Sequence, residues 1–223
     1  MKFALAIFAI ALLLGKQQGN CQSAFQNLDF ESANVPDVPT NQPGAPVNVD
    51  MGMPGWTVNP LYEGFGVGHN TVSLGGAVVA IEGPQFFSSQ ILEGNYTAYV
   101  QGSLAGIPEN AYIAQTGQIP LNSESLTFYV NQSPFATFQV TFGGQPIPVE
   151  QIGVGSNYDI MGGDISAYAG QTGELRFTAL PDTGGFLDNI QFSMSPVPEP
   201  ATLAVFATGA VLLALRRRRR RAN

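Results

Sequence analysis

The sequence predicts an all-β fold, an antiparallel β-sandwich or jelly roll, with a signal helix before it and a transmembrane helix after it. Short segments rich in β-branched and aromatic residues recur through the middle of the chain, and glycine-rich turns separate them. No amphipathic helical pattern lies between these segments, so the strands lack crossover helices and are expected to pair antiparallel. Residues 24–195 are long enough to form one domain with its own hydrophobic core.

The chain begins with a basic residue and an apolar run. Lys2 precedes an uncharged stretch over residues 3–14, and polar residues follow closely. This stretch is shorter than the roughly 20 residues of a membrane-spanning helix, and it has the order of a secretory signal peptide. We therefore expect residues 1–23 to be removed on export through the Sec machinery, with cleavage between Gly19 and Ala24. An uncleaved anchor and a buried core helix are the alternatives.

Cys21 is the only cysteine in the chain, which excludes an intramolecular disulfide and a metal site built from several cysteines. Attachment of a lipid to Cys21 would require small and aliphatic residues just before it. Gln18, Gly19 and Asn20 stand there instead. We expect Cys21 to leave with the signal peptide or to remain as an incidental thiol.

The body contains a series of expected strands. Their ranges are 71–74, 77–81, 96–101, 111–115, 126–130, 136–142, 174–179 and 187–192. Apolar and polar residues alternate most clearly in 137–142 and 174–178, which is the period of a strand with one buried face. Paired glycines such as Gly143-Gly144 supply the bends between strands.

Two segments are predicted to lack regular strands. Residues 34–60 contain six prolines, which cannot donate to a strand ladder, so we expect a long loop over the sheet. Glycines alternate within residues 63–70, which predicts a flexible loop around His69, the only histidine. No serine elbow motif accompanies His69, so catalysis by this residue is not expected and the chain is predicted not to be an enzyme.

The C-terminal residues 196–223 combine three features in a fixed order. The motif Val197-Pro198-Glu199-Pro200 comes first, residues 201–215 carry no charge, and a run of arginines follows. As a helix the apolar stretch spans about 22 Å, short of a bilayer core unless arginine stems extend it. Arginines stay on the cytoplasmic side of a membrane, which leaves the body outside and predicts a transient insertion into the inner membrane. The run consists of Arg216, Arg217, Arg218, Arg219, Arg220 and Arg221.

This tail resembles the PEP-CTERM sorting signal of Gram-negative bacteria that make extracellular polysaccharide. The resemblance covers the last 27 residues and depends on the motif, the apolar span and the basic cluster together. It implies recognition by an exosortase, a membrane-embedded cysteine protease-transpeptidase that cuts near Pro198-Glu199-Pro200 and passes the protein to the cell surface or the medium. The two prolines keep that segment extended, as a processing enzyme requires. An ordinary tail anchor with a basic stop is the alternative.

Removal of both ends changes the charge of the protein. Residues 22–197 contain fifteen carboxylates and a single basic residue, Arg176, for a formal charge of −14 instead of the −7 of the whole chain. Such a surface repels phosphate backbones, so nucleic acid is excluded as a partner and divalent cations are favoured over polyanions. Solubility alone is the simpler explanation of the acidic composition.

The body also resembles galactose-binding-like jelly rolls in the order of its motifs. These motifs are residues 27–31, Pro54-Gly55-Trp56, residues 98–102 and residues 187–190. The resemblance implies a carbohydrate-binding or adhesive module with a structural Ca²⁺ between the first and last strands. It makes Glu31 and Asp188 candidate calcium ligands, since a hard cation prefers oxygen donors. An exposed carboxylate at Glu31 and a hydrogen-bonded strand entry at Asp188 are the alternatives.

Four aromatic residues are candidates for stacking against a sugar. They are Trp56, Tyr62, Tyr112 and Tyr158. For Trp56, the sole tryptophan, a place in the core is the alternative. The sequence therefore leaves two functions open, a non-catalytic module that binds extracellular polysaccharide or mediates adhesion, and a structural surface or matrix protein without a specific ligand. A secreted glycan-active enzyme is a third.

Overall fold

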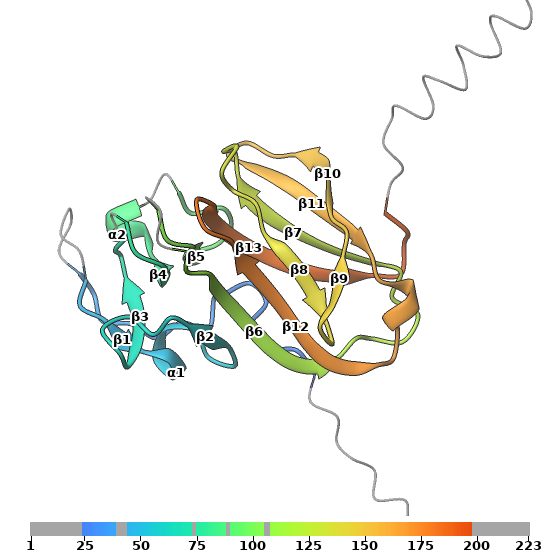
Figure 1. Cartoon of the computed structure of the whole chain (residues 1–223), viewed down its shortest axis with the longest axis horizontal. Coiled ribbons are helices and arrows are strands. Elements are labelled where there is room, and N and C mark those ends of the chain that lie inside the picture. The colour runs from blue at the N-terminus through green and yellow to red at the C-terminus, as the bar shows by residue number, and fades with distance from the viewer. Residues whose placement is uncertain (1–23, 39–43, 73–74, 88–89, 105–107, 198–223) are drawn as a thin grey trace, which may run out of the picture.

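The computed structural model describes residues 24–38, 44–72, 75–87, 90–104 and 108–197. Two β-sheets pack face to face over this part of the chain (Figure 1), which confirms the predicted all-β sandwich. Within it, every neighbouring strand pair is antiparallel except the parallel pair β3 (Gly66–His69) and β4 (Val78–Glu82).

The larger sheet has eight strands and the smaller one has five. In spatial order, the larger sheet contains β1 (Val47–Asn48), β3, β4, β5 (Thr97–Gln101), β13 (Gly184–Ser193), β7 (Ser125–Asn131), β11 (Tyr158–Asp164) and β10 (Glu150–Val154). The smaller sheet contains β2 (Thr57–Asn59), β6 (Ala111–Gln118), β12 (Thr172–Ala179), β8 (Gln139–Phe142) and β9 (Gln145–Ile147). Three short helical turns complete the described elements, α1 (Val49–Gly52), α2 (Pro84–Phe87) and η1 (Ser166–Tyr168).

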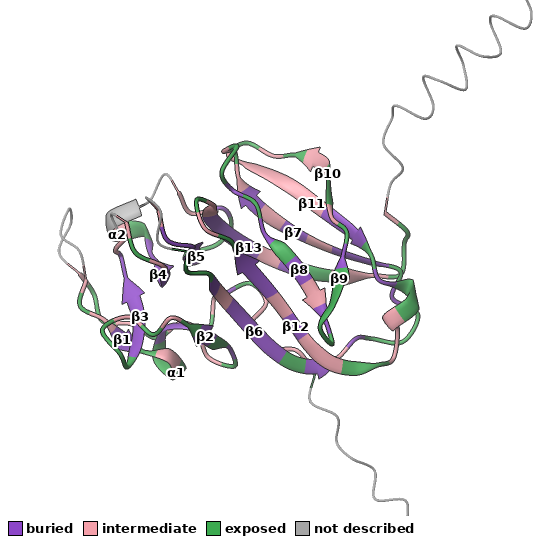
Figure 2. Ribbon diagram, in the orientation of Figure 1, coloured by how far each residue is buried: buried purple, intermediate pink, exposed green. Residues whose placement is uncertain are grey.

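Apolar side chains fill the space between the two sheets, and they come from strands whose buried and exposed residues alternate. Phe177 on β12 is fully buried, and its ring meets Phe128 of the opposite sheet edge-on at 5.1 Å between centroids. Trp56, just before β2, stacks on Phe30 at 5.6 Å. The Phe177–Phe128 contact joins the two sheets, and residues between the buried ones on the same strands face outward (Figure 2).

The glycine-rich segment 63–70 corrects one expectation. Its second half forms β3, in which all four residues are buried, instead of a flexible loop. Gly66 allows this because a Cβ there would lie 1.9 Å from the Val47 carbonyl oxygen of β1, so only glycine lets the two strands pair this closely. His69 is consequently a buried strand residue.

Other boundaries differ from the sequence-based expectation. The proline-rich segment 34–60 contains the short elements β1, α1 and β2 inside a largely irregular path. Thr71 and Val72 lie outside any strand, although a strand was expected over 71–74. β10 and β11 were not expected, because their glycines and polar residues obscure the strand period.

The described chain enters and leaves the sandwich on either side of the β6–β7 connection. Ala24 forms a bridge with Gln118 at the end of β6, and Ser193 pairs with Ser125 at the start of β7. The predicted signal peptide and the predicted C-terminal transmembrane helix lie outside the described residues. Within the part that is described, no helix is long and apolar enough to cross a bilayer.

Candidate ligand-binding site

A hollow of the described surface lies on the outer face of the five-stranded sheet. It is a cavity of about 770 Å³. Its floor consists of the outward-facing side chains of β6, β8 and β12, which are Tyr112, Gln139, Thr141, Glu174, Arg176 and Thr178. Its walls include Asn59, Pro60, Glu109 and Gly144. We call this feature the trough.

Strand alternation explains why these side chains share one face. On β12, Leu175 and Phe177 are buried in the core, so Glu174 and Arg176 project to the other side. The register then places Arg176 opposite Thr141 of β8 and opposite Ala114 of β6. Because Ala114 is small, it leaves room on the β6 side of the trough for the arginine side chain.

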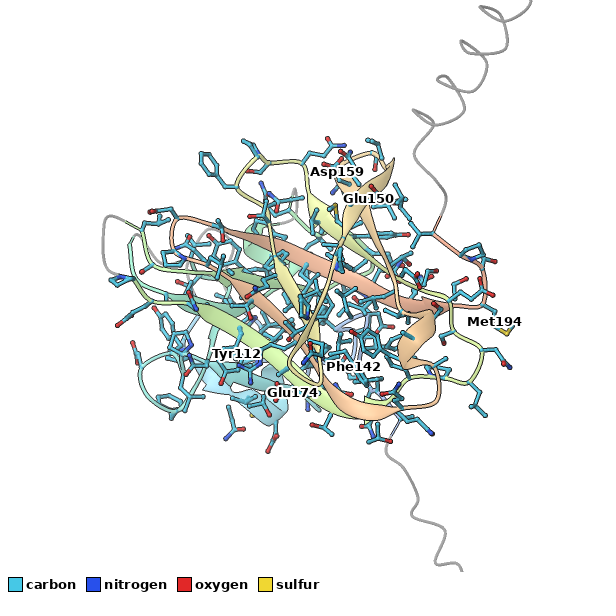
Figure 3. The ribbon with its side chains drawn as sticks, turned by 45° about the vertical axis from the view of Figure 1, so that its right-hand side comes forward. Tyr112, Phe142, Glu150, Asp159, Glu174 and Met194 are labelled. Carbon is cyan, nitrogen blue, oxygen red and sulfur yellow. The ribbon has the colours of Figure 1, made fainter. Side chains whose placement is uncertain are left out.

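A three-residue cluster organises the floor of the trough. The Arg176 Nε donates to Glu174 Oε1 at 2.9 Å, and Arg176 Nη2 lies 2.8 Å from the same oxygen. The guanidinium carbon stands 3.9 Å from the centroid of the Tyr112 ring, a cation–π contact. The hydrogen bond to Glu174 raises the pKa of Arg176 above its ordinary value, despite some burial. Figure 3 shows Tyr112 and Glu174 on the neighbouring strands β6 and β12.

The chemistry of the trough suits a polar ligand. Its amide and hydroxyl groups can both donate and accept hydrogen bonds, its carboxylates can accept them, and the stacked guanidinium and phenol supply flat surfaces. The turn after Pro60, outside the lining of the trough, exposes the apolar side chains of Leu61 and Phe65, at 44% and 55%. A cavity of this volume lies within the usual range of small-ligand sites.

The four aromatic candidates occupy different places. Tyr112 lies in the trough, and Tyr62 is half-buried in the turn that follows Pro60. Tyr158 lies on the other sheet, where its ring stacks on Tyr129 at 4.0 Å. Trp56 is only 4% exposed and donates from Nε1 to the Asn27 carbonyl, so its ring belongs to the core and is not offered to a ligand.

Glu31 and Asp188 both bind the segment that leads into β5. Glu31 Oε1 accepts from the backbone N–H groups of Asn95 and Tyr96 at 2.7 and 2.8 Å, and its Oε2 accepts from the Asn95 side chain. Asp188 Oδ2 accepts from Thr97 Oγ1 at 2.6 Å and from the Glu93 N–H at 3.1 Å.

These donors bear on the expected calcium site. A cation at either carboxylate would have to replace N–H and O–H groups that already point at its oxygens. Among the described residues no group of three acidic, histidine or cysteine side chains is placed to hold a metal ion. The arrangement therefore does not fit Ca²⁺ as it stands, and the calcium assignment stays a prediction.

Sequence reasoning named only Tyr112 among the floor residues of the trough. Glu174, Arg176, Gln139 and Thr141 were missed as site residues, although two signals pointed to them. They are the polar members of the two clearest alternating segments, and Arg176 is the single basic residue of the body. The sequence does not show that β6, β8 and β12 are neighbouring strands of one sheet.

Comparison with known proteins identifies the C-terminal segment. Residues 196–220 match the family described as the PEP-CTERM protein-sorting motif. The chain carries a PEP-CTERM sorting motif. This motif marks an exported protein that is sorted by an exosortase and targeted to the cell surface. Its Pro198-Glu199-Pro200 core and Arg216–Arg221 cluster lie outside the described residues.

No curated protein matches the chain. Two solved structures resemble its fold, both cyclases from Fischerella sp. The apo-form cyclase has a TM-score of 0.48 at 14% identity, covering 77% of this chain and 94% of that one. The second has a TM-score of 0.45 at 16% identity, covering 77% of this chain and 95% of that one.

Proposed function

We propose that the chain is a non-catalytic glycan-binding or adhesion module displayed at the bacterial surface. The trough on the five-stranded sheet carries the proposal, because it combines a cavity of about 770 Å³ with a polar floor and a stacked Arg176–Tyr112 pair. A polysaccharide chain offers hydroxyl groups for the polar side chains and flat sugar faces for the stacked pair.

The position of the trough supports this role. Tyr112 lies six residues along β6 from Gln118, which places it about 20 Å from the end of the sandwich where the described chain enters. The described chain also leaves beside the same β6–β7 connection. A ligand in the trough is therefore well separated from the end of the sandwich where Ala24 and Ser193 lie.

Ligand-linked stabilisation tests the proposal. A glycan that binds only the native state raises the unfolding free energy, by about 2.7 kcal/mol at a hundred times its dissociation constant. We expect at least one member of a panel of extracellular polysaccharides to raise the melting temperature. Tyr112→Ala should abolish the shift, and the matched control Tyr158→Ala, which removes a ring from the other sheet, should keep it. A panel without any shift would leave a structural surface protein as the function.

We also propose that an exosortase removes the tail after a transient insertion into the inner membrane. The test is the intact mass of the protein recovered from the cell surface and the medium. A mass ending near Val197, which disappears when Pro198-Glu199-Pro200 is replaced by alanines, would support processing. A mass running through Asn223 in both proteins would instead indicate a permanent anchor.

One observation favours a second candidate, a glycan-active enzyme. Glu109 and Glu174 line the same trough, and paired carboxylates are the usual catalytic groups of glycoside hydrolases. Glu174, however, is already paired with Arg176. Release of reducing ends from a bound glycan, lost in Glu174→Gln, would establish this activity.

A further inference from the structure

The trough contains two kinds of charge in unequal number. Glu109 stands on its wall, and Glu174 and Arg176 lie on its floor with side chains 42% and 33% exposed. Arg176 is the only basic residue between Lys16 and Arg216 in the sequence. The charged groups of the trough are therefore two carboxylates against one guanidinium.

Glu174 occupies the part of Arg176 that would best recognise an acidic ligand. A carboxylate binds an arginine most specifically through two parallel hydrogen bonds along one edge of the guanidinium. The edge formed by Nε and Nη2 is already turned toward Glu174 Oε1, at 2.9 and 2.8 Å. Tyr112 covers one face of the same group. An acidic ligand would have to displace Glu174 or use the remaining edge.

The field of the whole body opposes acidic ligands as well. Residues 22–197 carry a formal charge of −14, so a polyanion approaching the trough meets net repulsion over about one Debye length. This repulsion lowers both the association rate and the affinity of a polyanion, and added salt weakens the repulsion.

The uncharged groups of the trough complement hydroxyl groups. Gln139 and Asn110 each offer amide donors and acceptors, and Thr141 and Thr178 offer hydroxyls. The trough carboxylates can only accept hydrogen bonds when ionised. A sugar hydroxyl can donate to them, whereas a ligand carboxylate cannot.

Resting on the glycan-binding function proposed above, we infer that the trough selects neutral, hydroxyl-rich glycans and excludes polysaccharides that carry carboxylate or sulfate groups. The pairing of Arg176 with Glu174 makes this selection, because Glu174 neutralises the guanidinium of Arg176 and occupies the edge that a ligand anion would otherwise bind.

The test compares each acidic polysaccharide with its own neutral derivative. Polygalacturonate, alginate and hyaluronate are measured beside their carboxyl-reduced forms, with dextran and galactomannan as neutral polymers, by affinity electrophoresis and calorimetry. The protein is the exported chain purified from cells. EDTA is present so that no divalent cation bridges two carboxylates. At least one neutral form is expected to bind about tenfold more tightly than its acidic parent. High salt should reduce this difference in affinity.

Two variants locate the selection in the trough. Glu174→Gln frees the Nε–Nη2 edge of Arg176 and should raise the affinity for the acidic forms about tenfold. Glu150→Gln makes the same change in net charge on β10 of the other sheet (Figure 3), so it should leave the preference unchanged. Tighter binding of the acidic parents by the unaltered protein would overturn this inference and keep glycan binding. Binding to none of the polymers would overturn both proposals, and an equal response of the two variants would assign the selection to net charge alone.

Discussion

Strands β12 and β4 differ in how many of their faces are buried. On β12 the buried residues Leu175 and Phe177 alternate with the trough residues Glu174 and Arg176, so one face builds the core and the other meets solvent. On β4 all five residues are buried, and both faces are covered by protein (Figure 2). Binding chemistry is therefore available on the five-stranded sheet, while polar groups on β4 are enclosed.

The enclosed polar groups of the larger sheet are its distinctive feature. Glu82, the last residue of β4, is fully buried, and within the part of the chain that the structure describes its carboxyl group is poorly satisfied, with the Thr71 backbone as its one nearby polar group. Burial raises the pKa of Glu82 well above its ordinary value. Burial likewise raises the pKa of Asp188 on β13 from 3.8 to about 7, against the lowering effect of its hydrogen bonds to Thr97, Asn189 and Glu93.

The largest expected effect is a loss of stability as the pH rises. A carboxyl group whose pKa is higher in the folded state stabilises the fold fully below its unfolded pKa, and this contribution is lost as the pH rises through the folded pKa. For Asp188 the loss between about pH 4 and pH 7 is on the order of 4 kcal/mol, and Glu82 adds to it in the same direction. Urea unfolding across this range measures the effect.

The control for this prediction is a pair of isosteric substitutions. Asp188→Asn and Glu82→Gln remove the two titrations, so the double variant should show a much flatter dependence of unfolding free energy on pH. An unfolding free energy that increases from pH 4 to pH 7 in the unaltered protein would contradict the burial argument.

The two faces of β12 should separate stability from binding. Phe177→Ala removes a fully buried ring that meets Phe128, so we expect a loss of about 3–5 kcal/mol in unfolding free energy. Arg176→Gln, one residue away on the outer face, should change stability by less than about 1 kcal/mol and abolish glycan binding. Chemical unfolding and glycan titration of both variants check this, and equal destabilisation by the two would refute the assignment of faces.

The buried strand β3 depends on the absence of a side chain at Gly66. Gly66→Ala places a Cβ against the Val47 carbonyl and should lower the unfolding free energy by about 1–3 kcal/mol through overpacking. Gly75→Ala is the matched control, because a Cβ there would meet no atom within 4 Å. Thermal unfolding measures the stability of both variants. An unchanged melting temperature for Gly66→Ala would contradict the close β1–β3 pairing and support the flexible loop that the sequence predicts.

The smallest expected effect concerns the calcium prediction. Glu31→Gln weakens the hydrogen bonds that hold Asn95 and Tyr96, at a cost of about 1–2 kcal/mol. Because these donors already point at the carboxylate, we expect the same loss with and without EDTA in thermal unfolding. A melting temperature of the unaltered protein that falls in EDTA and recovers with Ca²⁺ would instead support a structural calcium.

Sequence patterns were most informative where a strand has one face in solvent. The alternation in residues 174–178 predicted a strand with one buried face, and Arg176 lies on the other face of that strand in the structure. The same logic failed for β3, because a glycine strand covered on both faces carries no alternation. For Trp56 the sequence left a sugar platform and a core ring open, since residue type alone does not tell a core ring from an exposed one, and the structure buries it.

The sequence by itself determined the all-β class, the C-terminal sorting motif and the strongly acidic body, because periodicity, motif order and charge are local or additive properties. Only the tertiary structure could reveal the trough. Tyr112, Thr141 and Arg176 lie on strands distant in sequence, and the register of β6, β12 and β8 brings them to one face. The sheet pairing likewise decided that Glu82 is enclosed while Glu174 meets solvent, since burial depends on which elements cover a strand and not on the residue itself.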